Sequence, residues 1–222
     1  MASALGILLI TGSAAHSDPL FEELFTNEMP ANLGLTSIEW RAFAGMEARD
    51  VTAAKREDLT AGIFLASAAG NPAAPTGFLA CGLMNELGIN EYAAIRTDLN
   101  LPQPGSFTWR MNATPGSKIM VRLLVQVNEK WFASSREMSP TVFGGPGQFP
   151  AASVEESEVQ FPFSRDARDW HEFELESGIA MAVGDACKLN LPNDPVTGVG
   201  FYVSTTSQTP SMLRLDTLRI LP

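Results

Sequence analysis

Apolar side chains occupy every second position from Ile119 to Val127, and the residues between them are of mixed character. The mixed positions on that second face are Met120, Arg122, Leu124, Gln126 and Asn128. Successive side chains of a strand point to opposite faces, so the pattern predicts a β-strand from Lys118 to Asn128 with one face in a core. A helix would instead need apolar residues three and four positions apart.

Short runs rich in β-branched and aromatic residues continue beyond residue 60, separated by Gly, Pro, Asn and Asp. Phe107–Asn112 alternates in the same way, and the turn residues Thr114–Ser117 predict that it forms an antiparallel hairpin with the strand that follows. A second tight turn is expected at Asn128–Lys130, before a strand at Trp131–Ser134. The other expected strands are Gly62–Ser67, Gly77–Leu83, Tyr92–Thr97, Val159–Phe163, Trp170–Leu175, Val199–Thr205 and Met212–Leu221. This spacing is typical of an all-β sandwich or barrel.

Helical signals are confined to two short segments near the N-terminus. Ser37–Met46, with Ser37 as a possible cap, and Ala53–Leu59 are the candidate helices. The segment Val142–Glu158 concentrates Gly, Pro and acidic residues, which predicts a long surface loop rather than a domain linker. We therefore expect one β-sandwich domain over residues 18–222.

The charge balance excludes several classes of function. The 222 residues include 15 Lys and Arg against 25 Asp and Glu, a net charge of −10. A protein that binds nucleic acid or an anionic membrane needs a local excess of cations, which this sequence nowhere shows. The only histidines are His16 and His171 and there are two cysteines, which excludes multi-His metal sites and disulfide frameworks.

The N-terminus has the features of an export signal. An apolar run, Leu5–Ile10, precedes small residues of the kind that suit signal-peptidase cleavage, so residues 1–17 are expected to be a signal peptide. Residues 1–4 carry no Lys or Arg, which either a truncated start or a start codon assigned inside the true signal would explain. The alternative is a buried first strand. The run is too short to insert across a bilayer, which takes about 20 apolar residues.

Export would place Cys81 and Cys187 in an oxidising space. Pairing would close a long loop, with a theoretical stabilisation of about 4 kcal/mol or more. Two buried free thiols are the competing interpretation, because Cys81 lies in an apolar, strand-like run.

Three segments together resemble the galactose-binding-like jelly roll of carbohydrate-binding modules in secreted bacterial proteins. They are the N-terminal Leu20–Phe25, the central aromatic strands and the last strand, Leu213–Ile220. The resemblance implies a jelly-roll sandwich, a location outside the cell, at the bacterial surface or in the periplasm, and a poly- or oligosaccharide as the partner. It also implies a structural calcium, with Glu23 and Asp216 at the matching positions. The residues themselves favour a β-bulge at Asp216, because the apolar face switches there, and both interpretations can hold.

Sugar sites combine an aromatic platform with fixed polar groups. Trp131 is the best candidate platform because it follows a polar turn at the start of a strand. The candidate polar groups, expected to line one concave face with it, are Arg122, Gln126, Asn128, Arg110 and Tyr202. A Trp in a β-sandwich is more often core, and Trp109 and Trp170 are expected to be buried.

No motif for catalysis is present. His171 lies among acidic residues, but the strand parity places Glu172, Glu174 and Glu176 on an outward row. The sequence lacks a nucleophile elbow, a phosphate loop and a zinc-protease motif. The leading hypothesis is a secreted, non-catalytic carbohydrate-binding domain. A structural or adhesive subunit of a cell surface or extracellular assembly is the second, and an enzyme that cleaves glycans with two unrecognised carboxylates is the third.

Overall fold

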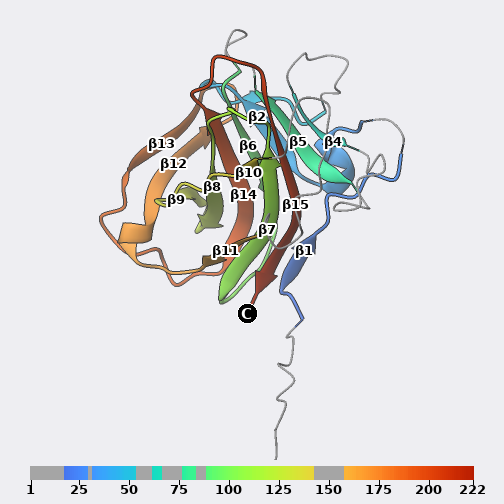
Figure 1. Cartoon of the computed structure of the whole chain (residues 1–222). Coiled ribbons are helices and arrows are strands. Elements are labelled where there is room, and N and C mark those ends of the chain that lie inside the picture. The colour runs from blue at the N-terminus through green and yellow to red at the C-terminus, as the bar shows by residue number, and fades with distance from the viewer. Residues whose placement is uncertain (1–17, 30–31, 54–61, 67–76, 84–88, 143–157) are drawn as a thin grey trace, which may run out of the picture.

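Two facing β-sheets make up the protein (Figure 1). The computed structural model describes residues 18–29, 32–53, 62–66, 77–83, 89–142 and 158–222. The expected all-β antiparallel sandwich is confirmed. The predicted signal peptide at 1–17, nearly all of the candidate helix at Ala53–Leu59 and nearly all of the loop at Val142–Glu158 lie outside the described residues.

The first sheet has seven strands, and its last strand in sequence lies near its centre. Its order is β10 (Thr141–Val142), β7 (Ser106–Ala113), β15 (Ser211–Leu221), β5 (Phe78–Leu83) and β4 (Ile63–Ala66), with β1 (Phe21–Glu23) paired to β15 and β11 (Glu158–Pro162) paired to β7. All of these pairs are antiparallel except β10 with β7.

The second sheet has eight strands, and every pair in it is antiparallel. Its order is β13 (Ala180–Ala186), β12 (Trp170–Glu176), β9 (Lys130–Ser134), β8 (Ile119–Val127), β14 (Val196–Thr205), β6 (Glu91–Arg96), β2 (Arg41–Ala44) and β3 (Arg49–Asp50). The strands expected from the sequence are therefore present, with ends shifted by a few residues.

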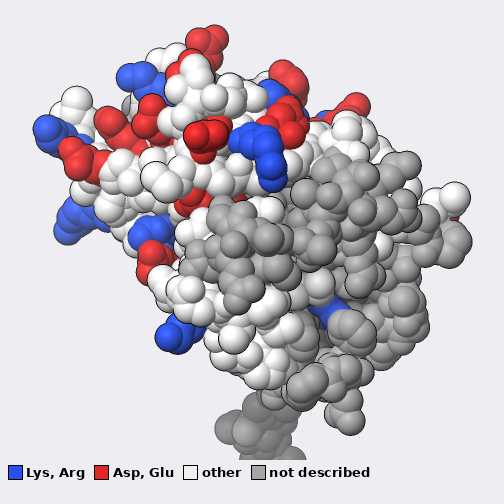
Figure 2. Space-filling view, turned by 90° about the horizontal axis from the view of Figure 1, so that it is seen from above, with Lys and Arg blue, Asp and Glu red and all other residues white. Residues whose placement is uncertain are grey.

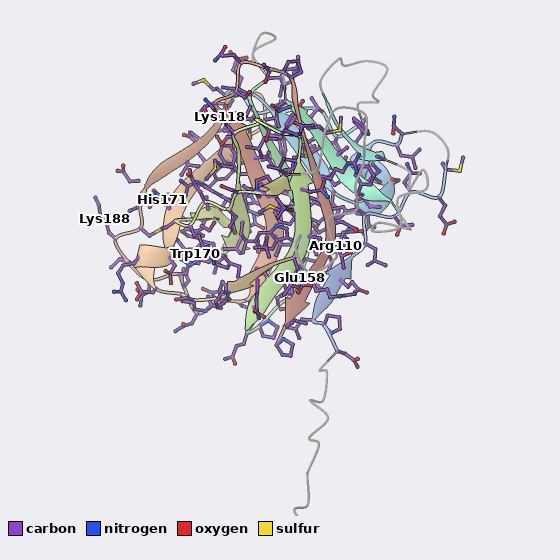
Figure 3. The ribbon with its side chains drawn as sticks, viewed as in Figure 1. Arg110, Lys118, Glu158, Trp170, His171 and Lys188 are labelled. Carbon is purple, nitrogen blue, oxygen red and sulfur yellow. The ribbon has the colours of Figure 1, made fainter. Side chains whose placement is uncertain are left out.

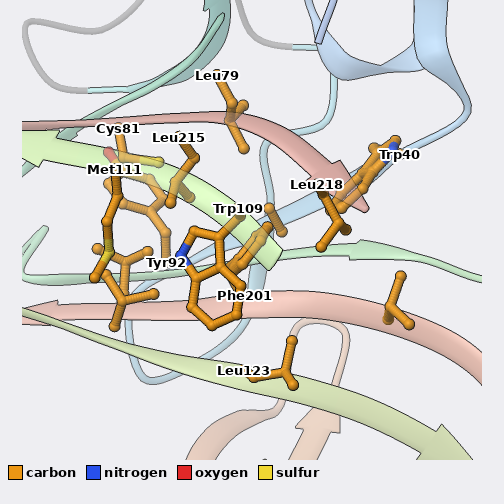
Figure 4. Close-up of a cluster of buried hydrophobic side chains, with 14 of the residues drawn as sticks. Trp40, Leu79, Cys81, Tyr92, Trp109, Met111, Leu123, Phe201, Leu215 and Leu218 are labelled. Carbon is orange, nitrogen blue, oxygen red and sulfur yellow. The ribbon is translucent and has the colours of Figure 1, made fainter. Parts of the chain in front are cut away.

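The main core lies between the sheets and is rich in aromatic rings (Figure 4). Trp109 of β7 packs edge-on against Phe201 of β14, with ring centroids 5.3 Å apart. Trp40 stacks on the same ring at 6.4 Å. Trp40, Trp109 and Trp170 are at most 1% exposed, which confirms that Trp109 and Trp170 are core residues.

The turn between β7 and β8 does not form a hairpin, so that prediction is wrong. The chain reverses at Thr114–Ser117, where the Ser117 N–H donates to the Thr114 carbonyl, but β7 and β8 belong to different sheets. Their apolar faces are opposed across the core. Turn chemistry specifies a reversal of direction, and it does not specify whether the next strand pairs or crosses to the other layer.

The hairpin expected next is confirmed. β8 pairs with β9, and Gln126 lies opposite Trp131. Asn128 and Glu129 both have positive φ, at 51° and 63°. This is the combination that a two-residue turn needs to match the twist of its strands.

The predicted helix at Ser37–Met46 is also wrong. A 3-10 turn, η1 (Leu35–Ile38), ends at Glu39, whose φ is 59°, and the chain continues as β2. Ala42, Phe43 and Ala44 are all buried there. Pairing with β6 and burial on both faces outweigh a short helical pattern.

The eight-stranded sheet also buries apolar residues on the face turned away from the main core. We call this set the outer cluster; its members are Phe43, Ala48, Ala93, Ile95, Leu124, Ala133, Phe173 and Met181. The sheet rolls around it until its two ends meet. The Met181 N–H donates to the Met46 carbonyl at 2.7 Å, and the Gly178 N–H donates to the Ala48 carbonyl at 3.1 Å. The β12–β13 hairpin thus contacts the β2–β3 turn. We call the face of the eight-stranded sheet that carries the outer cluster the rolled face, and it is filled with side chains.

Candidate functional site

Trp131 is the one tryptophan outside the main core, half-buried beside the outer cluster. It lies on the rolled face, near the end of the sheet where β8 turns into β9. Its ring reaches across β8 to Gly198 of β14, where a Cβ would stand only 2.8 Å from Trp131 Cη2. The absence of a side chain at Gly198 therefore makes room for the indole.

A cleft of about 700 Å³ lies at this end of the sheet. Three loops and two strand ends form it, with residues Thr97, Asp98, Leu99, Gln126, Asn128, Glu129, Asp194, Pro195 and Thr197. Two of the predicted ligand residues, Gln126 and Asn128, are among them. Trp131 is the residue of β9 that pairs with Gln126, so its side chain lies beside the cleft.

Polar groups in the cleft are held by hydrogen bonds. The Thr197 hydroxyl is 3.2 Å from Gln126 Oε1 and 3.4 Å from the Gln126 carbonyl. The Thr97 hydroxyl donates to Asp98 Oδ2 at 3.0 Å. Side chains fixed in this way lose little freedom when a ligand binds, which favours affinity.

Arg122 faces the same side of the sheet, but its guanidinium binds the protein itself. It donates to the carbonyls of Ser134 and Ser135 at 2.6 and 2.9 Å, and to Glu137 at 2.7 Å. These contacts tie β8 to the segment that follows β9. A ligand contact for Arg122 stays a prediction, and it would compete with them.

Tyr202 also belongs to the rolled face and points into it. Its hydroxyl donates to the buried carboxylate of Glu91, and its ring meets Phe173 edge-on at 5.4 Å. Burial, followed by the hydrogen bond to Glu91, raises the pKa of the Tyr202 phenol. The phenol therefore stays protonated at physiological pH and acts as the hydrogen-bond donor.

The structure does not bring Arg110 together with these residues. Arg110 lies on β7 in the other sheet, opposite Glu158 of β11 and away from the β12 strand that carries His171 (Figure 3). Its guanidinium pairs with Asp216 at 3.4 Å. The sequence did not predict that Arg110 lies far from the rolled face, because local patterns did not show that β7 and β8 belong to different sheets.

The two carboxylates proposed for calcium lie on opposite faces of the seven-stranded sheet. Glu23 is in register with the core residue Leu218, and it accepts hydrogen bonds from the Phe25 N–H at 2.8 Å and from Trp40 Nε1 at 3.0 Å. Asp216 points to the outer face, toward Arg110. A calcium ion shared by this pair is therefore not supported by their positions.

The bulge expected at Asp216 is present. The register of β15 against β7 shifts between Asp216 and Arg219, and Thr217 has a φ of 52°. Burial raises the pKa of the Asp216 carboxyl to about 6, while Arg110 and hydrogen bonds at Thr217 oppose the shift. A buried carboxyl of this kind titrates in a range where most carboxylates are ionised.

The acidic residues near His171 form the expected outward row. Glu172, Glu174 and Glu176 are exposed, whereas Phe173 is buried in the outer cluster. His171 Nδ1 is 3.1 Å from the Gly184 carbonyl across the β12–β13 pair. We refer to the three glutamates as the acidic row.

Three further findings concern the described residues only. They contain no group of three or more His, Cys, Asp and Glu side chains placed to hold a metal ion. Nor do they include a helix with the length and apolar character needed to cross a membrane. Cys81 and Cys187 are free thiols, with Cys81 in the main core.

Sequence reasoning missed Thr97, Asp98, Asp194 and Thr197, which complete the cleft. These residues come from loops that are distant in the chain and meet because β6, β8 and β14 are neighbours in the sheet. The clusters of Asn, Asp and Pro at these loops signalled turns. Their convergence depends on strand order, which no local pattern encodes.

Comparison with known proteins gives similarities of fold only. No family model matches the sequence, and no curated protein matches it. Among solved structures, the K2 cleaved adhesin domain of Lys-gingipain has a TM-score of 0.45 at 10% identity, covering 91% of this chain and 97% of that one. TmCBM61 in complex with β-1,4-galactotriose has a TM-score of 0.39 at 11% identity, with 90% and 98% covered.

A third similar structure is the catalytic domain of an endo-1,3-β-glucanase from Thermotoga petrophila. Its TM-score is 0.42 at 14% identity, and 91% of this chain and 96% of that chain are covered. All three TM-scores are below 0.5. The function is proposed below from the residues of the site.

Proposed function

We propose that this protein is a secreted, non-catalytic carbohydrate-binding domain, and that it binds a poly- or oligosaccharide at the cleft beside Trp131. The rolled face as a whole is not the binding surface in this proposal. Its middle is filled by the outer cluster, and the end that carries Gln126 and Asn128 adjoins the cleft.

One observation carries the proposal, the position of Trp131 next to fixed polar groups. The indole lies over Gly198, in register with Gln126, whose amide oxygen is bound by Thr197. A sugar ring has apolar C–H faces that pack on an aromatic ring and hydroxyls at its edge that pair with amides and hydroxyls. Trp131, Gln126, Thr197 and Asn128 offer both kinds of contact at one place.

Affinity gel electrophoresis against a panel of soluble polysaccharides tests the proposal. The panel includes galactan, xylan, mixed-linkage glucan, mannan, hydroxyethyl cellulose and methyl-esterified homogalacturonan. We expect at least one polysaccharide to retard the protein. The affinity derived from the retardation should be at least tenfold lower for Trp131→Ala and for Gln126→Ala. Trp131→Phe keeps an aromatic ring and should retain part of the affinity.

Gln160→Ala is the matched control, because Gln160 is an exposed glutamine on β11 in the other sheet. It should bind like the unmodified protein. Retardation that survives Trp131→Ala and Gln126→Ala would overturn the site. No retardation by any polysaccharide would overturn the function and favour the structural or adhesive subunit, whereas depolymerisation of a panel member would favour the glycan-cleaving enzyme.

A further inference from the structure

The charged side chains of the cleft are all of one sign. Asp98, Glu129 and Asp194 line it, each exposed, and none of the described lining residues is a lysine or an arginine. Elsewhere the surface mixes both signs, as the view in Figure 2 shows for one face, where acidic and basic side chains are interspersed. The cleft is thus a local concentration of negative charge.

The backbone fixes where these carboxylates lie. Asp98, in a bend after β6, has a φ of 62°, and Glu129, in the turn after β8, has a φ of 63°. The third loop is held by Arg165, which donates to the carbonyls of Pro192 and Asp194. The backbone positions of the three acidic residues are therefore held around the cleft, and the Asp98 carboxylate also accepts a hydrogen bond from the Thr97 hydroxyl.

The described cations near the cleft have other partners or face away. Arg165 packs over the Phe163 ring, donates to the Asp194 carbonyl and offsets part of the charge of the Asp194 carboxylate. Arg96 pairs with Glu39 and donates to the Ile38 carbonyl. Lys130 follows Glu129, but strand alternation places it on the face of β9 opposite Trp131. These cations reduce the negative potential of the cleft without reversing it.

We propose that the cleft selects neutral glycans and rejects polysaccharides that carry carboxylates or sulfates. This inference rests on the proposed function and adds the charge class of the ligand. An anionic sugar placed between Asp98, Glu129 and Asp194 meets like charges at short range, and no lysine or arginine is among the described residues that line the cleft. A neutral sugar has hydroxyls that donate to the same carboxylates in charge-assisted hydrogen bonds.

Matched pairs of polysaccharides test the selection. Methyl-esterified homogalacturonan is compared with the same polymer after de-esterification, and hydroxyethyl cellulose with carboxymethyl cellulose. Galactan, mixed-linkage glucan or mannan, where it binds, is compared with its C6-carboxylated form, and xylan with glucuronoxylan. At 20 mM salt we expect the anionic member of a bound pair to be at least tenfold weaker. At 0.5 M salt the difference should shrink, because the Debye length falls to about 4 Å.

Two triple variants separate the charge of the cleft from the charge of the whole protein. Asp98→Asn, Glu129→Gln and Asp194→Asn together should allow the anionic member to bind at low salt. Glu172→Gln, Glu174→Gln and Glu176→Gln remove three charges from the acidic row and should leave the discrimination unchanged.

Each outcome separates this inference from the proposed function. Anionic and neutral members binding equally well to the unmodified protein would overturn the charge selection and leave carbohydrate binding intact. Equal effects of the two triple variants would show that net charge, and not the cleft, sets the preference. Failure of every polysaccharide to bind would overturn both.

Discussion

The rings of Phe173 and Tyr202 meet edge-on with their centroids 5.4 Å apart, although β12 and β14 are separated by β9 and β8 in the sheet. Three strand spacings of about 4.8 Å would keep two such residues about 14 Å apart in a flat sheet. The contact is possible only because the eight-stranded sheet curls back on itself. The rolled face is therefore filled with side chains, like a second interior.

Loss of the Phe173 ring should destabilise the protein strongly. Phe173 is 5% exposed, so Phe173→Ala leaves a cavity in the outer cluster and removes the contact with Tyr202. We expect the free energy of unfolding to fall by about 3–5 kcal/mol in urea denaturation. Ile179→Ala, at a side chain 61% exposed in the β12–β13 hairpin, should change it by less than about 0.5 kcal/mol. A loss at Phe173 no greater than at Ile179 would mean that the roll is not closed in solution.

The turn before Trp131 should be improved by a glycine. Glu129 has a φ of 63°, where a residue with a Cβ is strained by roughly 1 kcal/mol. Glu129→Gly should raise the free energy of unfolding by about that amount. Glu129→Ala removes the same charge and keeps the strain, so it should show no such gain. Equal stabilities for the two variants would contradict the left-handed turn.

Glu23 should act as a structural hydrogen-bond acceptor, independently of calcium. Glu23→Ala leaves the buried indole N–H of Trp40 and the Phe25 N–H without their acceptor, which should cost about 2–3 kcal/mol. We expect the same loss of unfolding free energy with calcium and with a chelator. A loss that appears only when calcium is present would restore the calcium site implied by the family resemblance.

Asp216 should make stability fall with rising pH. Its pKa is raised to about 6 in the folded protein from 3.8, so between these values the folded state binds more protons than the unfolded state. Stability contributed by the protonated form is present below pH 4 and is lost as the pH rises through 6. A shift of two units corresponds to about 3 kcal/mol at most.

Asp216→Asn tests this linkage, because an amide cannot ionise. The stability of the variant relative to the unmodified protein should increase between pH 4 and pH 7. Urea denaturation at several pH values measures the difference. A difference that stays constant across this range would show that Asp216 is ionised throughout, held by Arg110.

Local patterns predicted most of the strands, because each depends on residues close in the chain, but they missed β2, β3, β10 and β13. The alternating apolar residues from Ile119 to Val127 are all buried on one face of β8. The change of apolar face predicted at Asp216 corresponds to a β-bulge in the structure. Within this strand, Leu124 indicated that the face opposite the main core is also buried. It is apolar on the supposedly outer side, and it is fully buried there.

What the sequence did not predict depends on which strands become neighbours. The turn at Thr114–Ser117 crosses between sheets, which separates Arg110 from Trp131. The cleft needs Thr97 and Asp194 to meet Gln126 through the order of β6, β14 and β8. Long-range pairing of this kind follows from how the whole chain buries its apolar faces.

Hydrogen exchange of the backbone amides, with and without the polysaccharide that binds best, tests the location of the ligand most directly. The account predicts slower exchange on binding at residues 97–99, 126–131 and 194–198, and unchanged exchange in β7 and β15. Protection centred on Arg110 and Asp216, or spread along the β12–β13 hairpin and absent from these three segments, would contradict it.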